Sequence, residues 1–139
     1  YVIDSIKAVM EYTENYPENW KSACDKGVNF YISQQFFADG RSWWRLPHEY
    51  PVEIHNQSQG IITLSRFNKS KDRTLEFAAT IARWTIREMQ DTEKGFFYYR
   101  KLKYYKNRLS FMRWSNAWMF LALAELISAQ KKAKGVPNA

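Results

Sequence analysis

Apolar residues recur at helical spacing along most of the chain. In the first stretch they fall three and seven positions apart, at Ile3, Ile6 and Met10, which places them on one face of a helix. This pattern predicts a helix over 3–15, and Pro17 blocks its continuation. A second helix is expected from about Glu18 to Phe37, with the aromatic and aliphatic residues again near one stripe.

Three more helices are predicted in the rest of the chain. They run over about 53–67, 72–90 and 112–131, and the middle one is rich in small and aliphatic residues. Asp72 is expected to cap that helix at its amino end. Its preceding turn is expected at Asn68 to Ser70, where the sequence is polar.

The remaining segments are connections. Turns are expected at 38–40 and 91–95, and a loop with two prolines at 41–52. Residues 96–109 contain two β-prone runs, FFYYRK and KYYKNR, which predict a short hairpin. The polar residues 132–139 are expected to form a flexible tail.

The two long connections belong to two copies of an internal sequence repeat. Gly40 is followed by Trp43, Trp44 and Arg45, and Gly95 is followed at the same distances by two tyrosines and an arginine. A helix then begins in each copy. His55 and Gln59 stand in the first copy where Trp114 and Trp118 stand in the second, and the members of each pair are four apart on one helix face. A period of this size is typical of arrays of helical hairpins.

The predicted fold is therefore all-α: helical hairpin repeats forming an open segment of an α/α toroid, with a small β-hairpin near 96–109. Residues 1–131 are expected to form a single helical-hairpin domain. The chain holds too few hairpins to close a ring, so it is expected to be a fragment of a longer toroid protein, to stay an open helical array or to associate with other copies. The remaining hairpins of the parent protein, or a homo-oligomer partner, would then cover its exposed apolar face.

Composition narrows the function classes. The chain is 17% aromatic and has a formal net charge of +7, with small basic clusters at 100–106 and 131–134. It contains no zinc-finger, RNA-recognition or basic-zipper pattern, so a nucleic-acid partner is not expected. It also lacks a phosphate loop, GxGxxG and GxSxG, which leaves nucleotide or nicotinamide chemistry without support and no cofactor is expected.

The cysteine content and the hydropathy of the chain bear on its expected cellular location. Cys24 is the only cysteine, so a disulfide within the chain and a cysteine-based metal cluster are excluded, and a buried free thiol is expected. No apolar run is long enough to span a membrane. These features favour the cytoplasm.

Three segments carry a resemblance to a known family. They are DTEKGFFYYRKLKYYKNRLSFMRWSNAWMFLALAEL, EYPVEIHNQSQGIITLSRF and ARWTIREMQ. Together they resemble the C-terminal third of a bacterial family encoded among lipopolysaccharide, O-antigen and capsule biosynthesis genes. The resemblance implies an α/α toroid, similar in shape to terpenoid cyclases and six-hairpin glycosidases, and a role in surface-polysaccharide biosynthesis. It implies no catalytic residues.

Titratable residues are densest around the start of the third predicted helix. His48, Glu49, Glu53 and His55 could supply an acid and a base for sugar chemistry, with Glu53, His55 and Glu49 as weak catalytic candidates. Equally, Glu53 could be a carboxylate that stabilises the helix dipole, and His55 a hydrogen-bonded helix histidine. No HExxH-type spacing occurs, so no metal site is expected.

Aromatic and polar residues near the two repeated loops are the ligand-binding candidates. Exposed rings beside arginines suit sugar stacking, amides can bond sugar hydroxyls, and Arg113 could hold an anionic sugar. The rings could instead pack beneath the loops or in the core, Gln59 could be a solvated or interhelical amide, and Arg113 could pair with a carboxylate. These candidates are Trp44, Arg45, His48, Gln59, Tyr98, Tyr99, Arg113, Trp114 and Trp118.

The function predicted from these residues is the binding or processing of an oligosaccharide or sugar phosphate, and whether the chain catalyses a reaction is left open. A non-catalytic structural or protein-interaction module is the first alternative. An isoprenoid-binding toroid is the second, although the acidic DDxxD-type run is missing. A sugar site requires rings and polar groups to converge on one cleft, whereas an interaction module requires them to pack against each other.

Overall fold

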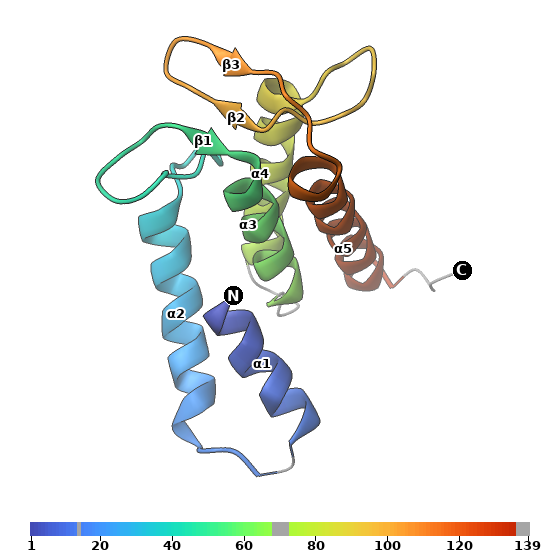
Figure 1. Ribbon diagram of the computed structural model, residues 1–139. Helices are drawn as coiled ribbons and strands as arrows, with labels where there is room; N and C mark the ends of the chain where they lie inside the picture. The colour runs from blue at the N-terminus through green and yellow to red at the C-terminus, as the bar shows by residue number, and fades with distance from the viewer. Residues whose placement is uncertain (14, 68–72, 136–139) are drawn as a thin grey trace.

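The chain is mostly helical with a small antiparallel sheet (Figure 1). The computed structural model describes residues 1–13, 15–67 and 73–135. Its helices are α1 (Val2–Tyr12), α2 (Asn19–Gln35), α3 (Ile54–Arg66), α4 (Thr74–Met89) and α5 (Trp118–Ala133). The five predicted helices are confirmed in place and order. The turn predicted at Asn68 to Ser70 and the cap predicted at Asp72 lie outside the described residues.

The helix ends differ from the predicted ones for local reasons. α2 stops at Gln35 because Phe36 is extended and forms an isolated β-bridge with Ser42. α5 is preceded by a π-helical segment, η1 (Met112–Ala117), which the apolar pattern did not predict. In this segment the N–H of Asn116 donates to the carbonyl of Phe111 at 3.2 Å, one residue farther back than in an α-helix.

The sheet has three two-residue strands in the order β1–β2–β3. These are β1 (Val52–Glu53), β2 (Arg100–Lys101) and β3 (Lys106–Asn107), and both pairings are antiparallel. The predicted hairpin within 96–109 is therefore confirmed, but with much shorter strands. The end of the proline-containing loop adds β1 as a third strand, with Val52 opposite Lys101 and Glu53 opposite Arg100.

The core lies around α3, which packs against both α4 and α5. Ten of its thirteen residues are buried, including Ile54, Ile61 and Leu64 at 0% exposure. By contrast, α1 contains no buried residue. Cys24 on α2 is buried and free, as predicted.

The two repeated loops have the same backbone design. Gly40 and Gly95 both adopt positive φ, at 93° and 76°. Two residues later, the N–H of Ser42 donates to Oε1 of Gln57 at 2.8 Å, and the N–H of Phe97 donates to Oδ1 of Asn116 at 2.9 Å. Each loop is thus fastened by a side-chain amide from the helical segment that follows it.

The copies differ in the length of the link between loop and helix. The loop glycines are 55 positions apart, whereas Gln57 and Asn116 are 59 apart, so the second link is four residues longer. The β2–β3 hairpin lies in this longer link. Both loops and the sheet gather at one end of the helices (Figure 1).

Candidate functional site

His55 lies in the first turn of α3 and is surrounded by aromatic rings. Its ring centroid is 4.9 Å from that of Trp118 and 6.2 Å from that of Trp114, both in edge-to-face geometry. The hydroxyl of Tyr1 is hydrogen-bonded to Nε2 of His55. Because α3 and α5 are neighbours, residues at equivalent positions of the two repeat copies meet here.

A polar network continues along the same face of α3. Oδ2 of Asp4, on α1, accepts hydrogen bonds from Nε2 of Gln59 at 3.0 Å and from Oγ1 of Thr63 at 2.7 Å. Nε2 of Gln59 also donates to Oγ1 of Thr63 at 3.0 Å. His55, Gln59 and Thr63 are four residues apart along α3, so one helix face presents them together.

This region also contains unused hydrogen-bonding capacity. Among the described residues, Nδ1 of His55, Oε1 of Gln59 and Oδ1 of Asp4 are buried without a hydrogen-bond partner. Buried polar atoms are normally paired, and an unpaired one is a place where a ligand or water can bind. We refer to Tyr1, Asp4, His55, Gln59, Trp114 and Trp118 as the His55 cluster.

Two cavities border the His55 cluster. One, of about 240 Å³, is lined by Tyr1, Tyr31, Gln35, Phe36, Ser42, Trp43, Trp44, His55, Asn56 and Gln59. The other, of about 370 Å³, is lined by Tyr1, Asp4, Ser5, Ala8, Gln59, Ile62, Arg66, Trp118 and Leu121. Tyr1 and Gln59 line both, so the two hollows adjoin at the cluster.

Burial favours the neutral forms of His55 and Tyr31. It lowers the pKa of His55, an effect that the negative charge of Glu53 partly offsets. Burial, followed by the charge of Asp4, raises the pKa of Tyr31 above its ordinary value. A neutral imidazole and a neutral phenol can each both donate and accept a hydrogen bond.

In the predicted acid–base group, both carboxylates are paired with arginines. Oε2 of Glu53 accepts from Nη2 and Nε of Arg100 at 3.0 and 3.3 Å. Oε2 of Glu49 accepts from Nη1 of Arg41 at 3.1 Å. His48 is exposed in a turn whose backbone pairs with Arg45. Within the described residues, no three His, Cys, Asp or Glu side chains are grouped closely enough to hold a metal ion.

The predicted tyrosines pack beneath the second loop. Tyr98 is 7% exposed, and its hydroxyl donates to Oδ2 of Asp91 at 3.0 Å. The ring of Tyr99 meets Phe111 edge to face at 5.1 Å and lies 4.5 Å from the guanidinium of Arg100. Neither ring therefore belongs to the His55 cluster.

The predicted tryptophans are more accessible. Trp114 is 53% exposed, and the guanidinium of Arg113 lies 5.9 Å from its ring centroid. Trp44 is half-buried and borders the smaller cavity. The guanidinium groups of Arg45 and Arg100 lie 5.3 and 5.0 Å from its ring centroid. Trp114 thus offers a ring face at the His55 cluster, and Trp44 contributes to the wall of the adjoining cavity.

Sequence reasoning missed Tyr1, Asp4 and Tyr31. Asp4 lies on α1, Tyr1 immediately precedes that helix and Tyr31 lies on α2, whereas the repeat involves only the later helices. One signal was present: the polar residues His55, Gln59 and Thr63 recur four apart in α3, which indicates that a polar partner faces this stripe.

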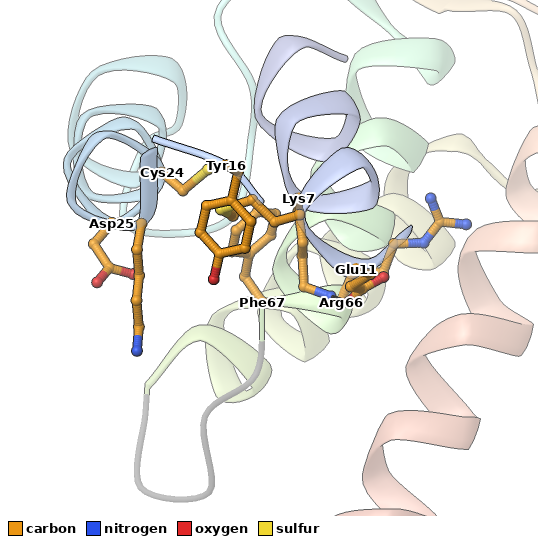
Figure 2. Close-up of a pocket in the computed structure, with 9 residues that line it drawn as sticks. Lys7, Glu11, Tyr16, Cys24, Asp25, Arg66 and Phe67 are labelled. Carbon is orange, nitrogen blue, oxygen red and sulfur yellow. Dashed lines mark hydrogen bonds and ion pairs between the residues drawn. The ribbon is translucent and has the colours of Figure 1, made fainter. Parts of the chain in front are cut away.

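A separate cavity of about 380 Å³ lies between α1, α2 and the end of α3 (Figure 2). Its lining includes Cys24, Tyr16, Phe67 and the ion pair between Lys7 and Glu11. Burial, and then the neighbouring Asp25, raise the pKa of the Cys24 thiol, which keeps it protonated and a poor nucleophile. A reactive-thiol site is therefore not indicated here.

No protein-family model, curated protein or solved structure matches the chain. Across the described residues, none of the helices has the length and apolar character needed to cross a bilayer.

Proposed function

We propose that the chain is a carbohydrate-binding domain and that the His55 cluster holds the sugar. The observation that carries this proposal is a half-exposed tryptophan, Trp114, beside buried polar atoms that have no partner among the described residues. Ligand sites commonly combine aromatic walls with a few convergent polar groups, and this arrangement has both.

The chemistry of the cluster suits sugar hydroxyl groups. Oε1 of Gln59 and Oδ1 of Asp4 are acceptors, and Nδ1 of a neutral His55 is an acceptor or a donor according to its tautomer. Sugar hydroxyls both donate and accept, so they can satisfy all three. The C–H face of a pyranose ring is apolar and packs on an exposed aromatic face such as that of Trp114.

Binding is better supported than hydrolysis. Glycosidases usually use two carboxyl groups on either side of the scissile bond. Asp4 is the one carboxylate in the His55 cluster, while Glu53 and Glu49 are paired with arginines. An oligosaccharide or sugar phosphate is therefore proposed as a ligand.

The wider architecture proposed for the domain is an open segment of an α/α toroid. The repeated loop design, and the packing of α3 between α4 and α5, support a hairpin array. The link to surface-polysaccharide biosynthesis, and a place within a longer protein, rest on the motif resemblance given above.

A saturation-transfer NMR screen tests the sugar site. The chain is mixed with bacterial surface monosaccharides, their oligomers and sugar phosphates, and the screen is repeated with Trp114→Ala and His55→Ala. Phe120→Ala is the matched control, because Phe120 is an exposed α5 aromatic outside the His55 cluster. We expect the sugar signal to be lost in the first two variants and retained in the third.

Two results would refute the proposal. One is the absence of any sugar signal from a chain whose far-ultraviolet circular dichroism shows it to be folded. The other is an equal signal from all three variants, which would place the sugar elsewhere.

An interaction module is the second candidate, favoured by apolar residues left exposed on α5. Phe120 is 78% exposed and Ile127 is 54% exposed. In the repeat, Phe120 is the counterpart of Ile61 on α3, which is fully buried. A helix of another hairpin or another copy would bury the α5 side chains similarly. Failure of the sugar screen, with concentration-dependent association by sedimentation, would favour this candidate.

A further inference from the structure

The excess positive charge of the chain is confined to one stretch. Residues 94–124 contain seven lysines and arginines and no aspartate or glutamate. The whole chain has 21 basic and 14 acidic residues. Outside this stretch, the numbers of basic and acidic residues are therefore equal, at 14 each. The basic residues of this stretch are Lys94, Arg100, Lys101, Lys103, Lys106, Arg108 and Arg113.

The structure neutralises only part of this charge. Arg100 pairs with Glu53 at 3.0 Å, and Lys101 pairs with Glu88 at 3.0 Å. Among the described residues, Lys103, Lys106 and Arg108 have no ion-pair partner within 4.0 Å. All three lie in or beside the β2–β3 hairpin, at the end of the molecule where the sheet lies (Figure 1).

The tip of the hairpin carries exposed rings. The N–H of Leu102 donates to the carbonyl of Tyr105 at 2.8 Å, which closes the turn. Tyr104 and Tyr105 are 86% and 64% exposed, and the aliphatic Leu109 is 60% exposed. We refer to Lys103, Tyr104, Tyr105, Lys106, Arg108 and Leu109 as the hairpin patch.

We propose that the hairpin patch docks the protein on the surface of an anionic lipid bilayer. Tyrosine is enriched at membrane interfaces because its ring sits among the headgroups with its hydroxyl in water. Lysine and arginine close to an anionic leaflet are attracted by its surface potential. The hairpin patch supplies both kinds of side chain, and residues 94–124, which contain it, include no aspartate or glutamate.

The apolar side chains favour a bilayer over a soluble polyanion. A nucleic acid or an acidic glycan is held by cations and stacking rings. Neither requires exposed aliphatic side chains, but the hairpin patch contains Leu109, and Met112 just beyond it is 84% exposed. Exposed apolar residues beside cations match the boundary between headgroups and acyl chains.

Vesicle sedimentation tests the proposal. Sucrose-loaded vesicles are made from two parts phosphatidylcholine and one part phosphatidylglycerol, with pure phosphatidylcholine as the neutral comparison. We expect the wild-type chain to sediment with the anionic vesicles, and to do so less as salt is added because screening weakens the attraction. The neutral vesicles are expected to bind it far more weakly.

Two double variants separate charge from ring insertion. Lys103→Gln with Lys106→Gln should weaken binding to anionic vesicles by about 25-fold, since each cation near such a surface is worth about a fivefold change. Tyr104→Ser with Tyr105→Ser should also weaken it. Lys21→Gln with Lys131→Gln, and Tyr12→Ser, are the controls, because they remove exposed residues of the same types elsewhere. The controls should bind as the wild type does.

Three outcomes would overturn the proposal. The chain could fail to sediment with anionic vesicles, or the control variants could lose as much binding as the hairpin variants. A single-stranded oligonucleotide or heparin could compete fully while the tyrosine variant bound vesicles normally, which would indicate a soluble polyanion site. None of the substituted residues belongs to the His55 cluster, so the sugar screen and this test fail independently.

Discussion

At the scale of single residues, His55 illustrates how a helix position acquires chemical character from its neighbours. Its Nε2 is bonded to the hydroxyl of Tyr1, and its Nδ1 is buried without a partner among the described residues. Burial disfavours the charged imidazolium, so the ring is held in the form that can accept a hydrogen bond.

This lowered pKa predicts a specific pH dependence. A histidine with a folded-state pKa below its unfolded value of about 6.5 makes the unfolded chain bind more protons, so stability falls as pH drops through that value. We expect His55→Gln to flatten this fall between about pH 7 and pH 5. In a His48→Gln background, the ring proton signal of His55 should titrate with a midpoint below about 6.5.

Urea unfolding at a series of pH values measures the first effect, and proton NMR the second. A midpoint above the unfolded value, or an unchanged pH slope in His55→Gln, would contradict the burial argument.

Much of the site could not be predicted from the sequence, and the reasons differ by residue. Helical spacing placed His55 and Gln59 on one face, and the repeat aligned them with Trp114 and Trp118. The pairing of Glu53 with Arg100 depends on the register of β1 with β2. Strands of two residues are too short for their sequences to specify that register. The approach of Asp4 depends on how α1 lies across α3, and no local pattern specifies that.

At the scale of elements, the two repeated loops provide a natural comparison. Both need a residue at positive φ, but their surroundings differ. A Cβ on Gly40 would lie 2.8 Å from the backbone N and Cα of Ile81 on α4, whereas a Cβ on Gly95 would meet nothing within 4 Å. The first loop is pressed against a helix, and the second is open.

Alanine substitutions at the two glycines should separate the cost of a positive φ from the cost of steric contact with α4. Gly95→Ala should cost about 1–2 kcal/mol, the usual penalty for a left-handed alanine. Gly40→Ala should cost this and roughly 1–3 kcal/mol more, because the α4 backbone must shift. Urea unfolding of the two variants measures the difference directly. Equal losses would mean that α4 yields to the added methyl group without cost.

The helices themselves were predictable because their apolar spacing extends over many residues. Their ends were not, since Phe36 leaves α2 to bridge Ser42 and Met112–Ala117 winds as a π-helix. In that segment the side chain of Asn116 both accepts from the N–H of Phe97 and donates to Oγ of Ser110 at 2.8 Å. The contact with Phe97 joins residues 19 positions apart, so local spacing does not reveal it.

At the scale of the whole molecule, the helices differ in how many of their residues are buried. α3 is buried and packs against both α4 and α5, while α1 has no buried residue. The contact of α1 with α3 includes the two hydrogen bonds that Oδ2 of Asp4 accepts. The wall of the larger cavity at the His55 cluster therefore includes the least buried helix.

Hydrogen exchange should show this difference. We expect the amides of α1 to exchange faster than those of α3, because opening α1 exposes little apolar surface. Asp4→Ala should speed exchange in α1 by about tenfold or more, since hydrogen bonds to a charged group contribute roughly 1.5–3 kcal/mol. Mass spectrometry of deuterated peptides measures both.

Ser5→Ala is the matched control, because Ser5 is exposed on the same helix, and it should leave the rates unchanged. Acceleration spread evenly over α1, α3 and α4 would show instead that Asp4 supports the global fold.

The confinement of the excess charge to residues 94–124 also gives the part of the molecule that carries the hairpin a net positive charge. A balanced body with a cationic end experiences a torque in an external field. Near an anionic surface, the protein would rotate before contact, so that the hairpin would arrive first. The end at which α1 and α2 are connected, opposite the sheet, would face away (Figure 1). The attraction would then make encounters more frequent and would also favour those in which the hairpin faces the surface. It acts only within the Debye length, which is about 10 Å at moderate salt.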